Sequence, residues 1–327
     1  MKYLIVDDEH ELYQRMFADL FKPSQYDVEE IPRMVIPLHL RWLYQLHHSD
    51  KINRRIKLPG KMLWRSCYRL HSYPFDPNEQ YCVLFLNGSL RYHFSEVYLK
   101  ELKKHHPNVK LAMILYDSFS NPTAARSISM IPLFDYVFSF DAGDCARNGF
   151  ERIYSTFSVP KDLYIDEDKK SAAFFIGFGM GRLKILQDAF ERITSSVPNC
   201  KLYVAGVHES DEKPIKDVVY NLTMPYEQEL QMAYNTECII DIVKEGQTGV
   251  SLRTCEAIAF NKKLLTNNVH IQSMPFYDSR FMSVFKEPKD IDIDFLTKKI
   301  VVKYNNAGYF SPLRIIDRID ELEKVMK

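Results

Sequence analysis

The sequence has no net charge, no paired cysteines and no long apolar run. Its 43 lysines and arginines are balanced by 43 aspartates and glutamates, so we expect no nucleic-acid partner. The six cysteines form no C-x-x-C pair and no cluster at metal-ligand spacing, which is typical of a reducing cytosol. No apolar run approaches the roughly 18 residues of a membrane span. Acids follow directly on the strand-like residues 2–6, which is unlike a signal peptide.

The order of segments predicts an α/β protein of two domains. At 327 residues the chain exceeds the roughly 250 to 300 residues at which a single core stops growing. Short apolar runs alternate with helical patterns, which indicates βαβ units and parallel sheets. Residues 155–170 break this alternation with a proline and a run of charges, which is typical of a linker. We therefore predict domains at 1–165 and 166–327, with a final helix at 313–326 that can cross back to the first domain.

Polar residues follow the predicted strands of the first domain. Asp8 follows the first strand, Asn87 and Gly88 follow another, and Asp117 and Asp141 follow the next two. The carboxyl ends of strands form the ligand-facing edge of an open α/β sheet. We therefore expect these residues on an acceptor side, with Asp117 the preferred general base toward an acceptor hydroxyl. Capping of a local turn is an equally good interpretation of Asp117 and of Asp141.

The opening residues 4–9 also mimic the start of a response-regulator receiver domain, whose paired acids hold Mg²⁺ beside a phospho-acceptor aspartate. That interpretation requires an acceptor aspartate at the end of a later apolar strand. Asp50 lies instead in a polar, basic stretch. A receiver-type signalling function is therefore disfavoured.

Residues 39–73 are the local exception to the balanced charge. They contain eight lysines and arginines against the single acid Asp50, together with both tryptophans, Trp42 and Trp64. Basic residues interleaved with aromatic ones suit an anionic membrane surface or a lipid diphosphate that carries a glycan. A solvated helix with its aromatics in the core is the competing interpretation. Nucleic acid is a weaker third, because the total charge is neutral.

A glycine loop opens the second domain. Gly177, Gly179 and Gly181 follow a predicted strand and precede Arg182 and a helical pattern. The spacing G-x-G-x-G differs from the G-x-G-x-x-G of dinucleotide folds, so it is weak evidence for NAD. A structural tight turn is the alternative interpretation.

The most informative stretch is a second glycine loop, after the apolar run 238–243 that predicts a buried strand. Thr248 or Ser251 can cap the helix that follows, and free N–H groups at its start favour phosphate. Arg253 can add a bidentate contact, and Glu256 can accept hydrogens from two ribose hydroxyls. A tight turn with a solvated ion pair is the plainer alternative.

This stretch resembles the donor-site segment of GT-B-fold glycosyltransferases. The matching pattern is G-x-x-x-R-x-x-E-A from Gly249 to Ala257, followed by K-K-L-L-T-N-N at 262–268. Residues 138–141 and 174–177, with the Gly-Arg pair after them, also match, and the best match is a bacterial group for capsular or lipopolysaccharide assembly. The resemblance implies an α/β fold of two Rossmann-like domains with parallel sheets that face each other across a cleft.

The resemblance also implies roles for the two domains. The second would bind a nucleotide-diphosphate sugar and the first a glycan or lipid-linked acceptor, with no metal and no cofactor, because helix N-termini and arginines can stabilise a departing diphosphate. The expected location is the cytoplasm, including the inner membrane surface through residues 39–73. The expected donor-binding residues are Gly177, Gly179, Arg182, Gly206, Tyr226, Gln247, Thr248, Gly249, Val250, Ser251, Arg253 and Glu256.

Four departures and alternatives accompany this hypothesis. Retaining relatives often show E-x7-E in the second loop, but Thr248 stands at the first position, which leaves the stereochemical outcome open. Asp290, Asp292 and Asp294 form D-x-D pairs in a polar segment, and we interpret them as helix-capping acids rather than metal ligands. Tyr226 lies where such enzymes contact the base, although a packing role is the stronger interpretation. A non-catalytic sugar- or nucleotide-binding protein on the same scaffold is the alternative function.

Overall fold

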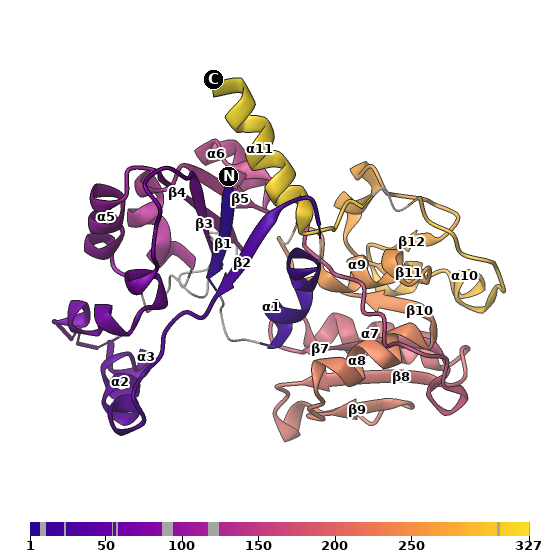
Figure 1. Cartoon of the computed structure of the whole chain (residues 1–327). Helices are drawn as coiled ribbons and strands as arrows, with labels where there is room; N and C mark the ends of the chain where they lie inside the picture. The colour runs from indigo at the N-terminus through magenta and orange to yellow at the C-terminus, as the bar shows by residue number, and fades with distance from the viewer. Residues whose placement is uncertain are drawn as a thin grey trace. The chain divides into compact units, whose positions relative to one another are not determined.

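The computed structural model describes residues 1–6, 11–22, 24–53, 55–56, 58–86, 94–116, 124–246, 248–305 and 308–326. The chain forms two compact units (Figure 1). Unit 1 comprises Met1–Ile153 and Pro312–Lys327, and unit 2 comprises Tyr154–Ser311. The sequence analysis expected the boundary near residue 165, whereas the segment before it already packs in unit 2, where Phe157 joins the core.

Unit 1 is built on a six-stranded sheet in the order β2-β1-β3-β4-β5-β6, with every neighbouring pair parallel. Strand β3 reads YCVLFL and is buried at every position, as expected of a parallel strand covered on both faces. The strand order changes direction between β1 and β3, which makes their carboxyl ends the switch point of this sheet. The strands are β1 (Lys2–Val6), β2 (Asp27–Ile31), β3 (Tyr81–Leu86), β4 (Val109–Leu115), β5 (Tyr136–Ser139) and β6 (Glu151–Arg152).

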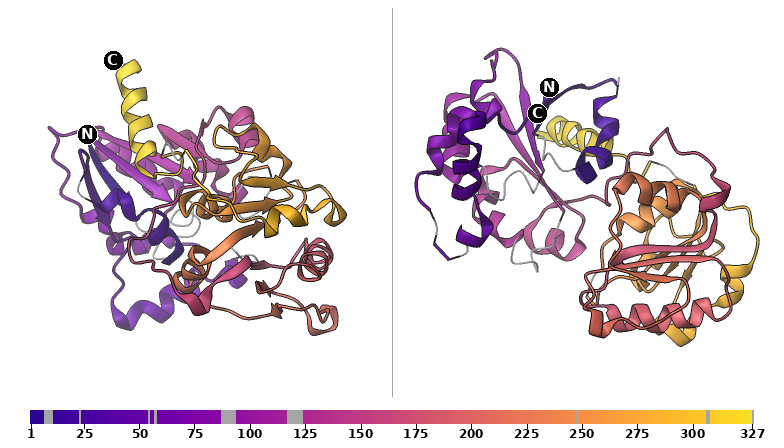
Figure 2. Two further views of the ribbon diagram at one scale, coloured as in Figure 1. Left: turned by 90° about the vertical axis from the view of Figure 1, so that its right-hand side faces the viewer. Right: turned by 90° about the horizontal axis from the view of Figure 1, so that it is seen from below.

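Helices cover both faces of this sheet, with α5 and α11 on opposite sides (Figures 1 and 2). Ser95 caps α5 by accepting a hydrogen bond from the Tyr98 N–H, and Tyr98 then packs with Phe85 and Leu111 in the core. The α-helices of unit 1 are α1 (Glu11–Met16), α2 (Arg41–His47), α3 (Asp50–Asn53), α5 (Glu96–His105), α6 (Ala142–Asn148) and α11 (Leu313–Met326). Its 3-10 helices are η1 (Ala18–Phe21), η2 (Leu38–Leu40), η3 (Lys61–Cys67), η4 (Arg69–Ser72) and η5 (Ala124–Leu133).

The last helix, α11, runs where the sequence predicts it and belongs to unit 1. Its residues Ile315, Ile316 and Ile319 are buried. Its polar side chains bind unit 1 through hydrogen bonds to residues on or beside several strands of the sheet. The pairs are Asp320 with Tyr3, Asp317 with Tyr26, Glu323 with Lys110 and Tyr136, and Arg318 with Glu151.

Unit 2 is built on a second six-stranded parallel sheet, in the order β12-β11-β10-β7-β8-β9. The strand order changes direction between β7 and β10, so the switch point of this sheet lies at their carboxyl ends. The strands are β7 (Ser171–Phe178), β8 (Cys200–Ala205), β9 (Val218–Tyr220), β10 (Thr236–Asp241), β11 (Lys263–Thr266) and β12 (Met282–Val284). The helices are α7 (Leu183–Thr194), α8 (Tyr226–Tyr234), α9 (Leu252–Ala259) and α10 (Ile293–Thr297), with the 3-10 helices η6 (Glu167–Lys169), η7 (Glu209–Asp211), η8 (Val269–Ser273) and η9 (Pro288–Asp290).

The sheet of unit 2 separates two apolar cores. Successive side chains of a strand point to opposite faces, and so Phe175 packs with Phe190 of α7, whereas Phe174 packs with Ile258 of α9. Figure 2 (right) shows α7, in pink, and the orange helices α8 and α9 on opposite sides of this sheet. The helix α7 therefore begins on one side of the switch point and α9 on the other.

The acidic segment after β12 caps helices, as the sequence analysis expects. Asp292 accepts a hydrogen bond from the Phe295 N–H at the start of α10 (3.0 Å), and Asp290 accepts one from the Glu287 N–H (3.1 Å). At the other end of α10, the buried Lys263 ammonium donates to three carbonyl oxygens, those of Phe295, Leu296 and Lys298.

The packing of α11 predicts the effect of truncating its buried face. Ile316 has no exposed surface, whereas Val325 on the same helix is 84% exposed. We expect Ile316→Ala to lower the free energy of unfolding of unit 1 by about 2 to 5 kcal/mol, because it leaves a cavity. Val325→Ala is the matched control and should change it by well under about 0.5 kcal/mol. Urea denaturation measures both, and equal effects would contradict this packing.

Candidate functional site

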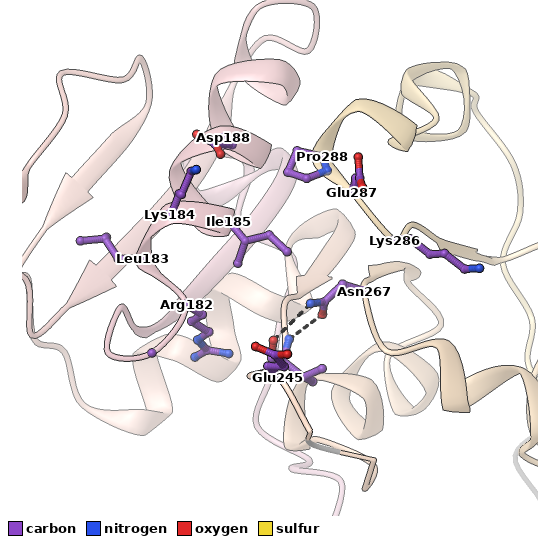
Figure 3. A pocket seen from close by; sticks show the side chains of 12 residues that line it. Arg182, Leu183, Lys184, Ile185, Asp188, Glu245, Asn267, Lys286, Glu287 and Pro288 are labelled. Atoms are coloured by element: carbon purple, nitrogen blue, oxygen red, sulfur yellow. Dashed lines mark hydrogen bonds between the residues drawn. The ribbon is translucent and has the colours of Figure 1, made fainter.

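A pocket of about 590 Å³ lies at the carboxyl edge of the sheet of unit 2 (Figure 3). Its walls come from the loops that follow β7, β10, β11 and β12, so it includes the switch point between β7 and β10. Open α/β sheets bind their ligands in this place. The lining residues are Gly181, Arg182, Leu183, Lys184, Ile185, Asp188, Val243, Glu245, Asn267, Lys286, Glu287 and Pro288.

The helix α7 begins in this pocket with free amide groups. Its first backbone hydrogen bond runs from the Leu186 N–H to the Arg182 carbonyl (3.0 Å), and no side chain caps its N-terminus. The N–H groups of Leu183, Lys184 and Ile185 precede that bond, and these three residues line the pocket. Uncapped amides at the positive end of a helix dipole favour an anion.

Arg182 bridges the two loops of the switch point. Its Nε donates to the carbonyl of Phe178, the last residue of β7 (2.9 Å), and its Nη1 donates to the Ile242 carbonyl just after β10. The guanidinium carbon lies 5.5 Å from the centre of the Phe175 ring. Burial lowers the pKa of Arg182, but a guanidinium stays charged in proteins. The bridge therefore places a positive charge beside the start of α7.

Three of the predicted glycines have local structural reasons. A Cβ on Gly177 would lie 2.7 Å from Nη2 of Arg182, so glycine at this position makes room for the guanidinium. A Cβ on Gly179 would lie 3.0 Å from a Val207 methyl group. Gly206 turns the chain after β8 with φ +69°, a conformation that other residues rarely adopt.

The pocket lining holds as many basic as acidic residues, but the two kinds differ in their ion pairs. Arg182, Lys184 and Lys286 are basic, and Asp188, Glu245 and Glu287 are acidic. Two of these acids have lysine partners outside the lining, because Lys213 lies 3.7 Å from Asp188 and Lys289 lies 2.6 Å from Glu287. In the described part of the chain, Lys184 and Lys286 form no ion pair. The ammonium groups of Lys184 and Lys286 are therefore available to an anionic ligand.

The paired asparagines after β11 fix the loop after β10. Asn267 accepts a hydrogen bond from the Val243 N–H (2.7 Å) and donates to the Val243 carbonyl (3.2 Å), as Figure 3 shows. Asn268 donates to the Gly249 carbonyl (3.1 Å). Sequence analysis quoted these residues only as part of a pattern, and the structure gives them this positioning role.

The start of α9 is capped and closed by side chains. Ser251 is its N-cap residue and accepts a hydrogen bond from the Thr254 N–H (3.1 Å). Ser251 and Thr254 both donate to the buried carboxylate of Asp241, at 2.5 and 3.0 Å. Burial raises the pKa of Asp241. Of the two predicted caps, Ser251 is therefore the one observed.

Arg253 and Glu256 bind each other in a buried network. Nη1 of Arg253 donates to Glu256 and Nη2 to Glu229, both at 2.6 Å, and the Tyr226 hydroxyl donates to Glu256 at 3.2 Å. Glu256 has no exposed surface. Burial raises the pKa of Glu256, while the two carboxylates outweigh burial and raise the pKa of Arg253. In this conformation these residues join α8 to α9 and offer a ligand no free group of Glu256.

The other predicted site residues lie apart from the pocket or outside the described residues. Asp141 caps α6 by accepting a hydrogen bond from the Asp144 N–H (2.8 Å), which agrees with the capping interpretation. Thr248, Gly249 and Val250 lead into α9. Asp8, Asn87, Gly88, Asp117 and Gln247 lie outside the described residues.

Of the lining residues, sequence analysis predicted only Arg182 as a donor contact and missed the others, among them the charged Lys184, Glu245 and Lys286. Lys184 follows the glycine loop directly, so its place beside Arg182 was a signal that could have been used. Lys286 follows a three-residue edge strand, and no sequence pattern indicates it. Across the described residues, His, Cys, Asp and Glu side chains form no group of three that could hold a metal ion, and no helix there could span a membrane.

The buried network makes a prediction about stability. Arg253→Ala leaves the carboxylates of Glu256 and Glu229 without their cation, so we expect unit 2 to lose about 3 to 5 kcal/mol at neutral pH without any ligand. A buried, unpaired Glu256 has a raised pKa and folds best when protonated, so the loss should grow as the pH rises above the ordinary carboxyl range and shrink as the pH falls back toward that range. Thermal unfolding of the variant between pH 4.5 and 8 measures this trend. Arg253→Met with Glu256→Gln should recover much of the loss, whereas an Arg253→Ala variant as stable as the parent would favour a role in ligand binding alone.

Comparison with known proteins identifies the architecture. No family model matches the sequence, and no curated protein matches it. A putative UDP-N-acetylglucosamine 2-epimerase from Listeria monocytogenes has a similar structure, with a TM-score of 0.52, 10% identity and coverage of 99% of this chain and 97% of that one. An alpha-glucosyltransferase in complex with UDP-glucose and DNA containing an abasic site has a TM-score of 0.51 at 10% identity, covering 98% and 90%. Such identities establish a shared fold, and this chain therefore has the α/β architecture of the GT-B type, with two Rossmann-like units.

Proposed function

We propose that this chain is a glycosyltransferase that moves a sugar from a nucleotide-diphosphate sugar to a glycan or lipid-linked acceptor. The observation that carries the proposal is the pocket at the switch point of unit 2, where the start of α7 and Arg182 meet. Its volume of about 590 Å³ falls in the range of small-molecule sites, about 300 to 1,000 Å³. The GT-B-type fold and the resemblance of the donor segment support the same assignment.

The donor diphosphate is proposed to bind at the start of α7. Three amide groups and the Arg182 guanidinium converge there, and Lys184 and Lys286 add positive charge. As the bond to the sugar breaks, negative charge grows on the diphosphate, and fixed donors stabilise it most when they are already in place. These groups can do so without a metal ion.

The proposal keeps the donor contacts expected at the start of α9, but Arg253 and Glu256 must first release their present partners to make them. Arg253 would give up one of its two carboxylate partners and bind a phosphate oxygen in its place. Glu256 would reach a ribose only if Tyr226 and Arg253 released it, because it is fully buried here. Donor contacts through Gly249 and Ser251 need only backbone groups.

The acceptor is proposed to bind unit 1, with a carboxylate that removes the proton of the attacking hydroxyl. Asp117 is the preferred base and Asp141 the second candidate, since each follows a strand of the parallel sheet. We further propose that the reaction belongs to the assembly of bacterial surface polysaccharide and takes place in the cytoplasm, at the inner membrane surface. The basic, aromatic segment 39–73 supports this setting.

Donor binding tests the α7 assignment. A thermal-shift screen against UDP, GDP, CDP and TDP sugars should find a stabilising donor, because a bound ligand raises stability by mass action. With that donor, calorimetry should show that Arg182→Gln weakens binding by about 1.5 to 3 kcal/mol, the usual range for a charge-assisted contact. Lys303→Gln, an exposed charge away from the pocket, is the control and should bind normally. Normal donor binding by Arg182→Gln would contradict the assignment of the donor diphosphate to the start of α7.

Turnover tests the catalytic assignment. Asp117→Asn should bind the donor normally and lower transfer by about 10² to 10⁴-fold, the usual contribution of a general base. Asp141→Asn is the comparison, because asparagine caps a helix as well as aspartate does and should leave α6 intact. If only Asp141→Asn lost transfer, Asp141 and not Asp117 would be assigned as the general base. A protein that binds a donor but transfers to no acceptor would support the non-catalytic alternative.

A further inference from the structure

The segment around α2 carries two apolar stripes, and only one of them faces the core. Leu40 packs against the core of unit 1, and Tyr44 and His48, at spacings of four, are buried. Leu38, Trp42 and Leu46 repeat the same spacing two residues earlier. Two residues turn a helix by about 200°, so this second stripe points away from the first.

The second stripe is exposed. Leu38 is 81% exposed, Trp42 65% and Leu46 48%. Ile56 and Leu63, from the same region of the chain, are also exposed. Scattered apolar residues are normal on a protein surface, but a tryptophan in an apolar stripe marks a contact site. We call these five residues, Leu38, Trp42, Leu46, Ile56 and Leu63, the apolar surface.

The apolar surface stands on an ordered support. Trp64 is buried, stacks edge-on against Tyr44 at 5.2 Å and donates from Nε1 to Nδ1 of His47 (2.8 Å). The other nitrogen of His47 lies 2.7 Å from the Pro59 carbonyl. These contacts join α2 to η3. The exposed side chains are therefore held outward by residues that pack inward.

The surroundings of the apolar surface are basic. Arg41, Arg55, Arg65 and Arg69 are exposed, and the stretch 39–73 contains a single acid. Arg65 has one partner, an exposed glutamate at 3.5 Å. A second copy of the chain would bring like charges together at this surface, which disfavours self-association. An anionic surface complements it.

We propose that the apolar surface docks unit 1 on a bilayer that contains anionic lipids. The leucines and the isoleucine would enter the acyl boundary, Trp42 would lie at the level of the headgroups, and the arginines would bind lipid phosphates. The proposal gives residues to the membrane setting of the proposed function. It does not depend on the transfer reaction, because no donor-binding residue takes part.

Vesicle binding by the full chain tests this proposal. The test uses phosphatidylcholine vesicles that contain about one third phosphatidylglycerol, which mimics an anionic leaflet. These vesicles should bind the protein, and vesicles of pure phosphatidylcholine should bind it far less. Trp42→Ser with Leu46→Ser should lower the partition coefficient at least about tenfold. Arg41→Gln should lower it about fivefold, which corresponds to about 1 kcal/mol for each basic residue near the surface. Val301→Ser, a 91% exposed apolar residue of unit 2, is the matched control and should bind as the parent does.

Tryptophan fluorescence supplies a second readout. The chain has two tryptophans, and Trp64 is buried, so a blue shift on anionic vesicles should come from Trp42 and disappear in Trp42→Ser. Equal vesicle binding by the parent and the Trp42→Ser, Leu46→Ser variant would overturn the proposal. Self-association that this variant abolishes, without vesicle binding, would assign the surface to a second copy instead. Donor binding by calorimetry should be the same in the variant and the parent, so failure of the donor site and failure of this proposal are distinguishable.

Discussion

The hydrogen bonds of Arg182 across the switch point of unit 2 are the interaction on which the candidate site depends. One guanidinium joins the loop after β7 to the end of β10, and glycine at position 177 is what leaves it room. Two carbonyl oxygens and an aromatic face offset part of the cost of burying the charge. None of these direct partners is an anion, and the buried carboxylate of Asp241 interacts with the guanidinium only electrostatically. We propose that the charge of Arg182 serves a ligand at the start of α7.

The two helix starts beside the switch point differ in this respect. At α9 the cap of Ser251, the carboxylate of Asp241 and the pairing of Arg253 with two glutamates satisfy the local polar groups. At α7 the first amides have no capping side chain, and the pocket beside them holds both basic and acidic residues. Sequence analysis placed the diphosphate mainly at α9. The uncapped amides beside Arg182 make the start of α7 the place that we propose for the diphosphate, and no residue of α9 lines the pocket there.

Much of the fold could be predicted because it follows from local patterns. Alternation of strands and helices, the cap at Ser251, the capping acid Asp292 and the final helix are all set by residues close in sequence. The partners of Arg253 could be predicted only in part, since Glu256 is one helical turn away but Glu229 comes from another helix. The orientation of α2 could not be predicted, because its two stripes are both apolar and only tertiary packing decides that Tyr44 turns inward and Trp42 outward.

The central claim is that an anionic donor binds the amides at the start of α7, and hydrogen–deuterium exchange tests it directly. The N–H groups of Leu183, Lys184 and Ile185 precede the first bond of the helix, so they should exchange rapidly in the free protein. Saturation with the nucleotide diphosphate of the donor should slow exchange in a peptide that covers 181–186. If exchange slowed only in a peptide that covers 249–256, with no change at 181–186, the result would contradict the account. The diphosphate would then be assigned to the start of α9.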